Sequence, residues 1–499
     1  MKLRAAETAE AVNGKIIYGD ADTLICNITT DSNKMKGEDL FVPIIGARVD
    51  AHKFIVNAAK AGATAAFTAY DTDKLAELSG LSAEGFTEAL SAKAPGRDRS
   101  FVLIKVDETR NALQSLGAYY REKYVHIPYV GVTGSVGKTT LREMTACALS
   151  ASYKVYSTKG NANSQTGVPI TVTETDEAAD IGVIEMGMSE FDEMSRISEV
   201  VKCDTAVFTV IGVSHIGNLG SRENIMREKL HILDGMHDGG KLILNADDDM
   251  LSRDDIRDFF PEKCRDKDIE ILYYGTGAKA DISAADISNK DGVYEYTLVI
   301  KNEKLMRVHL SVAGEHMILN SLAALSVAYV HGADPEKAAE AVGGFTSLDG
   351  RGRIYESAGI RIINDAYNAA PQSVKAGLKV LDGMQTEERH IAVLADMLEL
   401  GPNEADYHRE VGEYIAAETP NIDIVMLYGE LSKHTAEGIK LGFCEEPSRH
   451  MPWVYCFDSL DELKAALKSE VYAGDVCLFK GSNSMKLGQL VNELYPETK

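Results

Sequence analysis

The sequence predicts an α/β protein built from three domains, and three observations lead to this prediction. The chain has 499 residues, and at about 100–200 residues per domain this length fits three domains better than two or four. Hydrophobic residues make up 45% and charged residues 26% of the chain, which leaves enough apolar content for each domain to bury a core. From residue 128 onward, short runs rich in Val and Ile alternate with longer amphipathic stretches, the pattern of β-α units around a largely parallel sheet.

Two boundaries divide the chain into expected domains of residues 1–107, 108–335 and 336–499. The first boundary lies just before an amphipathic helical run, and the second lies where a Gly-Ala-Asp-Pro string predicts the end of a long helix. The first domain is expected to be a small α/β unit, the central one a P-loop-type, mostly parallel sheet with helices, and the last one a doubly wound α/β unit.

The predicted strands of the two larger domains are short apolar runs. In the central domain a run at 293–300 followed by one at 306–310 predicts an antiparallel hairpin that turns at 301–303. The parallel strands are expected at 129–132, 181–184, 206–210 and 241–244 in the central domain, and at 361–363, 391–394, 424–427 and 476–479 in the last one.

Charge and cysteine content exclude several classes of protein. Lys and Arg number 52 against 76 Asp and Glu, a net charge of −24, and a surface this acidic argues against nucleic acid or an anionic membrane as the main partner. No stretch approaches 18 apolar residues, and the N-terminus lacks the apolar run of a signal peptide, so membrane insertion is not expected. Seven scattered cysteines without Cys-x-x-Cys spacing favour a reduced, cytoplasmic protein without a disulfide framework or zinc site.

A glycine-rich turn between the strand at 129–132 and a following helix predicts a phosphate-binding loop. Backbone N–H groups of such a turn point at phosphate oxygens, and the helix N-terminus adds a partial positive charge. Lys138 would reach the β- and γ-phosphates, and the Thr139 hydroxyl would contact Mg²⁺. The predicted phosphate-binding residues are Gly134, Ser135, Val136, Gly137, Lys138, Thr139 and Thr140.

The loop departs from the strict P-loop pattern, which places a glycine where this chain has Val132, so Gly134 must make the turn. An ordinary glycine-rich turn between a strand and a helix is the alternative interpretation. The string Gly-Lys-Thr-Thr at such a junction argues against it.

A magnesium ion beside the phosphates needs a carboxylate, and Glu185 ends the strand at 181–184, where a doubly wound sheet places its ligand groups. His215 follows the next strand, and by itself it is more typical of a loop or core histidine than of a metal ligand. Lys229 by itself is typical of a solvated helix lysine. Its ammonium group cannot bind Mg²⁺, which prefers hard oxygen donors.

Over nearly its whole length the chain resembles the Mur ligases, a family of ATP-dependent amide ligases of cell wall biosynthesis. The phosphate loop resembles that family's variant, which accounts for the displaced glycine. Thr30-Asp31-Ser32 and the segment 46–54 resemble its uridine-nucleotide-binding segment, and residues 161–169 resemble its substrate-facing loop. Further similar strings begin in the last domain at Gly352, Asp365, Ala395 and Lys480.

The resemblance implies two Mg²⁺ ions, one held by Thr139 and Glu185 and the other by His215 and Lys229. Lys229 is implied to be carbamylated, because CO₂ on its neutral amine gives an anionic oxygen donor. The resemblance implies catalytic roles for Lys138, Lys229, His215 and Arg353, and contacts to ATP from the loop and from Asn320, Arg353 and Asp365. The implied substrate-binding residues are Asp31, Ser32, Arg48, Asp50, His52, Asn161, Asn163, Thr166, Tyr367 and Asn368.

Two strings imply the activity: Asp-x-Tyr-Asn at 365–368 and Asp-Met-Leu-Glu-Leu-Gly at 396–401. They imply a member that adds D-alanyl-D-alanine to UDP-N-acetylmuramoyl-tripeptide through an acyl phosphate. The first domain would bind the UDP-sugar peptide, the central one ATP, and the last, Rossmann-like one the dipeptide. These small molecules are the implied partners of a monomer. Asn33 and Asn483 stand where the family has Arg. A sibling ligase for another amino acid, or a non-catalytic ATP-binding module, remains an alternative.

Overall fold

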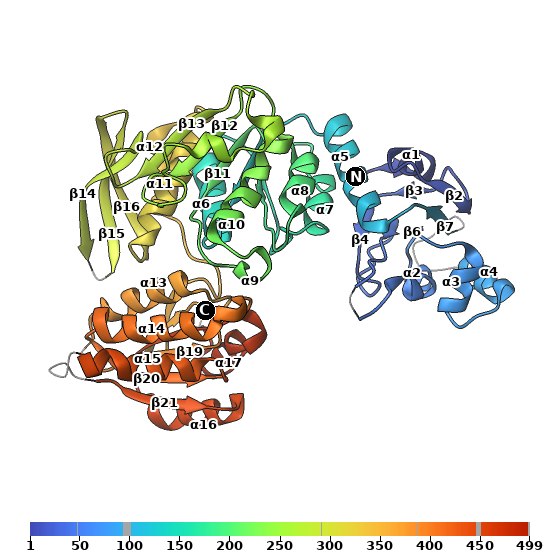
Figure 1. Ribbon diagram of the computed structural model, residues 1–499. Coiled ribbons are helices and arrows are strands. Elements are labelled where there is room, and N and C mark those ends of the chain that lie inside the picture. The colour runs from blue at the N-terminus through green and yellow to red at the C-terminus, as the bar shows by residue number, and fades with distance from the viewer. Residues whose placement is uncertain (47, 93–100, 291, 387, 446–450, 498–499) are drawn as a thin grey trace.

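The computed structural model describes residues 1–46, 48–92, 101–290, 292–386, 388–445 and 451–497. They form three bodies that follow one another along the chain (Figure 1), and helix α5 (Thr109–Tyr124) leads from the first body, in blue, to the central one. The third body, in orange and red, lies against a different side of the central body. Among these residues no helix combines the length and apolar content that crossing a membrane requires.

The first body is a five-stranded sheet covered by short helices. Its elements are β2 Lys15–Tyr18, β4 Asn27–Thr29, β5 Asp39–Phe41, β6 Ala65–Thr68, β7 Val102–Lys105, α2 Ile55–Lys60, α3 Thr72–Leu78 and α4 Ala83–Ser91. The strands run in the order β2-β7-β6-β5-β4, and only β2 pairs in the antiparallel sense. Phe41, Phe86 and Phe101 are buried together in the core beneath α2, α3 and α4.

The central body is built on a nine-stranded sheet. Its strands are β8 Tyr129–Thr133, β9 Val155–Ser157, β10 Ile181–Glu185, β11 Thr205–Phe208, β12 Lys241–Asn245, β13 Glu270–Gly275, β14 Ile282–Lys290, β15 Val293–Ile300 and β16 Glu303–Ala313. They run in the order β16-β15-β14-β13-β12-β11-β8-β10-β9, parallel from β9 to β14. The predicted parallel strands and the predicted antiparallel hairpin are confirmed, because β15 and β16 pair across a turn at Lys301 and Asn302.

Helices cover both faces of this sheet. The elements are α6 Lys138–Ser150, α7 Gly167–Thr173, α8 Glu193–Val201, α10 Arg222–Leu230, α11 His316–Val330 and α12 Pro335–Gly343. Helices α6, α11 and α12 pack on one face through Leu141, Met144, Leu322 and Val342, which lie in one buried cluster. Helices α5, α8 and α10 share the other buried cluster. The start of α6 therefore lies at the carboxyl ends of parallel strands, where such sheets bind ligands.

The third body is a six-stranded sheet with helices on both faces, so the predicted doubly wound arrangement is confirmed. Its elements are β17 Arg353–Ser357, β18 Ile360–Asn364, β19 His390–Ala395, β20 Ile422–Tyr428, β21 Trp453–Phe457, β22 Val476–Lys480, α13 Pro371–Asp382, α14 Glu404–Glu418, α15 Ser432–Glu445, α16 Leu460–Glu470 and α17 Leu487–Leu494. The strand order is β17-β18-β22-β19-β20-β21, and only β17 is antiparallel to its neighbour.

The second boundary expected from the sequence falls at the start of α12. This helix packs against α6 and β16, and its Ala338, Ala339 and Val342 are buried in the central core together with Phe345. Residues 336–345 thus pack with the central body, although the expected boundary assigned them to the last domain. Apolar side chains on one face of α12 hold it there, and a Gly-x-x-Pro signal marks the end of a helix without saying which body the next helix joins.

Candidate active site

The loop between β8 and α6 has the backbone that a phosphate-binding turn requires. Gly134 has φ 141°, and a Cβ at this position would collide with the hydroxyl of Thr209, so only glycine fits here. Gly137 has φ 84° and caps α6. Two hydrogen bonds to the neighbouring β11 segment fix the loop: Ser135 N donates to Val210 O at 2.8 Å, and Thr209 Oγ1 donates to Val136 O at 2.6 Å.

Lys138 folds back over this loop. Its Nζ donates to the carbonyl oxygens of Gly134 at 2.9 Å and Ser135 at 3.3 Å, and within the described chain it has no ion-pair partner. Burial lowers the pKa of Lys138; the Glu185 carboxylate opposes this effect and the positive charge of Arg351 adds to it. A half-buried cation without an ion-pair partner favours an anionic ligand, and the loop N–H groups offer a place for it.

Glu185, at the end of β10, is 1% exposed and is surrounded by donors. The Thr139 hydroxyl lies 3.1 Å and the Asn163 Nδ2 2.7 Å from its Oε1, and Arg142 Nη1 lies 3.1 Å from its Oε2. Arg142 was not among the residues expected from the sequence. Its spacing was a usable signal, since Arg142 follows Lys138 by four residues and Thr139 by three, which places it on their face of α6.

His215 lies in the loop after β11, in the left-handed region with φ 63°. Its Nδ1 is 3.0 Å from Oε2 of Glu399, a residue of the third body. Burial, together with the positive charge of Lys138, lowers the pKa of His215 to about 4. The ring is therefore neutral at pH 7 and can offer a lone pair to a metal ion.

Lys229 is not a solvated helix lysine, which is what its local sequence indicated. Its side chain is 1% exposed, and burial, with the charge of Lys138, lowers its pKa well below the usual range. The neighbouring Glu228 accepts hydrogen bonds from the backbone N–H groups of Asp192 at 3.1 Å and Met194 at 2.9 Å. Among the described residues no acceptor pairs with the Lys229 amine, so it is a buried amine that favours its neutral form.

The donor atoms suit Mg²⁺ at the position of Thr139 and Glu185. They suit it incompletely at the position of His215 and Lys229. Thr139 and Glu185 supply hard oxygen atoms beside the phosphate loop, as Mg²⁺ prefers. His215 and Lys229 supply only nitrogen, so an oxygen donor would have to be added at Lys229. No group of three or more His, Cys, Asp or Glu side chains suited to a metal ion occurs in the described ranges.

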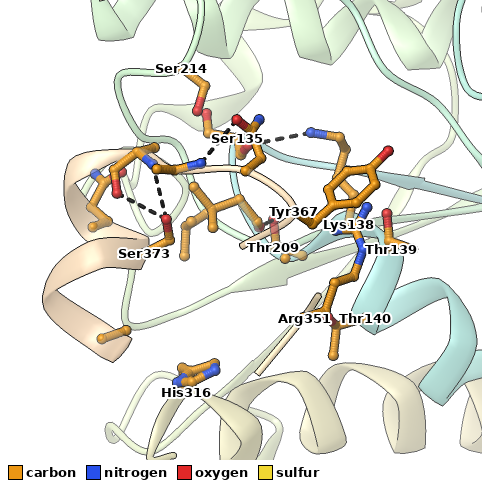
Figure 2. A pocket seen from close by; sticks show the side chains of 18 of the residues that line it. Ser135, Lys138, Thr139, Thr140, Thr209, Ser214, His316, Arg351, Tyr367 and Ser373 are labelled. Carbon is orange, nitrogen blue, oxygen red and sulfur yellow. Dashed lines mark hydrogen bonds between the residues drawn. The ribbon is translucent and has the colours of Figure 1, made fainter. Parts of the chain in front are cut away.

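A cavity of about 700 Å³ lies between the central and third bodies and brings most predicted residues together. Figure 2 shows Tyr367 and Arg351 of the third body beside the start of α6, which carries Lys138 and Thr139. The predicted residues that line the cavity are Ser135, Val136, Gly137, Lys138, Thr139, Thr140, Asn161, Asn163, Glu185, His215, Asn320, Asp365, Tyr367 and Asn368. We call this space the nucleotide cavity.

On the third body, Asp365 and Lys480 form an ion pair at 2.5 Å, and Lys480, 2% exposed, also donates to Asn368 O at 3.2 Å. Arg353 does not line the nucleotide cavity, because its Nη2 pairs with Glu497 at 2.7 Å and its Nη1 donates to Ser347 O. Arg351, which the sequence did not single out, lines the cavity instead.

The residues expected at the UDP-sugar lie on the first body, and they do not line the nucleotide cavity. Asp50 and His52 form a closed network: His52 Nδ1 lies 2.6 Å from Asp50 Oδ1, and His52 Nε2 accepts from Ala69 N at 3.1 Å. Tyr70 donates to the other Asp50 oxygen. Both nitrogens of the buried His52 ring are thus already used by the protein.

The remaining expected residues lie in loops or at a helix start. Asp31 accepts from the backbone of Asn33 at 3.0 Å and lies 3.5 Å from the Lys34 amine. Ser32 is half-buried and Arg48 is exposed. Thr166 precedes α7 and lies within hydrogen-bond distance of the Ser164 hydroxyl, outside the residues that line the nucleotide cavity.

Comparisons with known proteins agree over the whole chain. Three family models match: the Mur ligase family, catalytic domain, over residues 24–121, the Mur ligase middle domain over 132–328, and the Mur ligase, glutamate ligase domain over 350–483. The UDP-N-acetylmuramoyl-tripeptide–D-alanyl-D-alanine ligase of Bacillus subtilis (strain 168) is 33% identical over 498 residues, covering 99% of this chain and 98% of its own length. The enzyme of the same name from Haemophilus influenzae is 28% identical and covers both chains fully.

Solved structures of similar fold point to the same family. Crystal structure I of MurF from Acinetobacter baumannii matches with a TM-score of 0.81 at 26% identity, covering 99% of each chain. MurF ligase from Thermotoga maritima in complex with ADP matches in fold with a TM-score of 0.72 at 24% identity, covering 94% of this chain and 97% of that one.

Proposed function

The chain belongs to the Mur ligase family, and from this premise we propose that it joins D-alanyl-D-alanine to UDP-N-acetylmuramoyl-tripeptide with hydrolysis of ATP to ADP and phosphate. The observation that carries the proposal is the nucleotide cavity, which places the phosphate loop of the central body opposite Asp365, Tyr367 and Asn368 of the third. The relatives that match over the full chain bear the name of this activity.

Formation of an amide from a free carboxylate needs activation. The terminal carboxylate of the tripeptide attacks the γ-phosphorus of ATP, the bond to the bridging oxygen of ADP breaks, and an acyl phosphate forms. The amine of the dipeptide then bonds to the acyl carbon, a proton leaves the nitrogen, and phosphate departs with the carbon–oxygen bonding electrons. The protein's part is to position the groups and to offset charge. Lys138, a half-buried cation over the loop, would offset the repulsion between carboxylate and triphosphate.

Two Mg²⁺ ions, when bound, would neutralise phosphate charge and orient the reacting oxygens. Thr139 and Glu185 would hold one, and His215 with Lys229 the other. CO₂ adds only to an unprotonated amine, and the lowered pKa and missing acceptor of Lys229 supply that form. The resulting carbamate would provide the oxygen donor that the second position needs.

We propose the roles of the remaining site residues domain by domain. Asn320, Arg353 and Asp365 would contact the nucleotide, with Arg353 released from Glu497. Tyr367 and Asn368 would face the dipeptide. The domains of residues 1–107, 108–335 and 336–499 would take the UDP-sugar peptide, ATP and the dipeptide. The predicted contacts to the UDP-sugar peptide are Asp31, Ser32, Arg48, Asp50 and His52. The predicted substrate-binding residues of the central domain are Asn161, Asn163 and Thr166.

We place the enzyme in the cytoplasm as a monomer. All seven cysteines are free thiols, which suits a reducing compartment.

A turnover assay separates this function from its rivals. Purified protein is given ATP, Mg²⁺ and UDP-N-acetylmuramoyl-tripeptide, with D-alanyl-D-alanine or with single amino acids as acceptor, and ADP and product mass are followed. We expect ADP release that depends on the dipeptide. The product should be heavier than the UDP-sugar peptide by the mass of D-alanyl-D-alanine less one water. Turnover only with a single amino acid would indicate a sibling ligase. Binding of ATP without turnover under any acceptor would indicate a non-catalytic module.

A further inference from the structure

A second cavity, of about 850 Å³, adjoins the nucleotide cavity. The residues that line both cavities are Thr139, Asn161, Arg351, Tyr367, Asn368 and Glu399. They form a junction at the start of α6, next to the position expected for the γ-phosphate. The second cavity extends away from the phosphate loop, between the central and third bodies, and we call it the side cavity.

The charges that line the side cavity are almost all used by the protein. Arg142 is bound to Glu185 and to Glu143. Asp349 accepts from Asn364 Nδ2 at 2.9 Å. The Glu399 carboxylate lies against His215.

Arg351 is the exception. Within the described chain its guanidinium has neither an ion-pair partner nor a hydrogen-bond acceptor. Burial lowers the pKa of Arg351. The guanidinium carbon lies 3.9 Å from the centre of the Tyr367 ring. The backbone that carries the ring is fixed on both sides, because Tyr367 N donates to Gly350 O at 3.0 Å and Asn483 Nδ2 donates to Tyr367 O at 3.2 Å.

Stacking on an aromatic ring fixes the plane of a guanidinium and leaves its edge free to bind a planar carboxylate through two N–H groups. Three carboxylates, Glu143, Asp349 and Glu399, also line the side cavity. They disfavour a polyanion such as a triphosphate and suit a ligand that carries a positive end. One free guanidinium among carboxylates matches a zwitterion with a single carboxylate.

We infer that the side cavity receives the acceptor dipeptide and that Arg351 binds its C-terminal carboxylate. This inference rests on the proposed function and goes beyond it, because it assigns a cavity and a specificity residue to the acceptor. Arg351 lines the junction together with Thr139, so a carboxylate held at Arg351 keeps the dipeptide next to the phosphate loop.

The test compares the free acid with its amide. Binding of D-alanyl-D-alanine and of D-alanyl-D-alaninamide is measured by calorimetry on the full-length protein saturated with the non-hydrolysable ATP analogue AMP-PCP. The wild type should prefer the free acid by about 10- to 100-fold, the usual range for hydrogen bonds to a charged group. Arg351→Met should bind both ligands with the affinity of the wild type for the amide, and its affinity for AMP-PCP should stay within twofold.

Two further variants sharpen the comparison. Arg351→Lys keeps the charge and loses the two-pronged geometry, so it should retain part of the preference even if Arg351→Met folds poorly. Arg361→Met removes an exposed arginine of the same body whose side chain donates, among the residues that the structure describes, only to Gln385 O, and it should keep the full preference.

Three results would overturn the inference, and they differ in what they say about the proposed function. Weakened AMP-PCP binding in Arg351→Met with an intact preference for the free acid would place Arg351 at the nucleotide and overturn the inference, while the proposed function would stand. Loss of the preference in Arg353→Met but not in Arg351→Met would overturn it in favour of the other arginine. A wild type that binds neither dipeptide would overturn both the inference and the proposed function.

Discussion

The guanidinium of Arg142 and the carboxylate of Glu185 form an ion pair at 3.1 Å in which both side chains are 1% exposed. The pair joins α6, which starts at the phosphate loop, to the end of β10. Arg142 also donates to Gly160 O at 2.8 Å, so one side chain links the loop helix, the predicted metal ligand and the segment that leads to Asn161 and Asn163.

Arg142→Met should lower the free energy of unfolding by about 3 kcal/mol, because it leaves the buried Glu185 carboxylate without its counter-charge. Chemical denaturation monitored by circular dichroism measures this. Arg253→Met is the matched control, since Arg253 and Asp255 form an exposed pair worth about 1 kcal/mol or less. Equal losses in the two variants would contradict the role assigned to Arg142.

Lys229→Ala should lower turnover by about 100-fold or more, the range expected when a metal site loses a ligand or its support. Short carboxylic acids such as acetate should restore part of the rate by supplying the missing oxygen donor. Lys241→Ala, which removes a half-buried lysine paired with Glu270, controls for the lost charge. Normal turnover in Lys229→Ala would rule out the carbamate.

The lowered pKa of His215 predicts a pH effect on stability. The folded pKa is about 4, below the unfolded value of about 6.5, so between these values the unfolded chain binds the extra proton. Stability is therefore lost as pH falls from 6.5 towards 4, by about 3 kcal/mol at pH 4. The quantity to measure is the free energy of unfolding of the wild type minus that of His215→Asn at several pH values, which cancels other histidines. A flat difference across this range would contradict the buried, neutral ring.

Gly134→Ala should weaken binding of an ATP analogue and destabilise the fold by about 1–3 kcal/mol, because the backbone conformation suits only glycine and the new methyl group meets Thr209. Titration calorimetry and thermal melts measure the two effects. Gly344→Ala is the control, as a Cβ there has ordinary contacts and the backbone is unstrained. Unchanged analogue binding in Gly134→Ala would show that the loop does not need this turn.

The sequence predicted the parallel strands well because strands buried on both faces are continuous apolar runs. It did not indicate β9, which has three residues, or β14, whose second half is exposed and lacks an apolar pattern. For the site, local sequence could not reveal that Lys229 is buried, because its neighbours Arg227 and Glu228 are charged and the burial comes from packing between helices.

Arg351 and Arg353 show a similar limit of prediction from sequence. Gly350 and Gly352 both have positive φ, and this turn sends Arg351 into the cavity and Arg353 towards Glu497. A Gly-Arg-Gly-Arg string does not indicate which arginine faces the ligand, because turn geometry decides it.

Transfer of an oxygen isotope shows whether the nucleotide cavity activates a carboxylate by phosphoryl transfer. UDP-N-acetylmuramoyl-tripeptide labelled with ¹⁸O in its terminal carboxylate is incubated with the protein, ATP, Mg²⁺ and D-alanyl-D-alanine, and the released phosphate is analysed by mass spectrometry. We expect one ¹⁸O atom in each phosphate, since the attacking carboxylate oxygen leaves with it. Release of phosphate without the label, or no release when both substrates are present, would contradict the account.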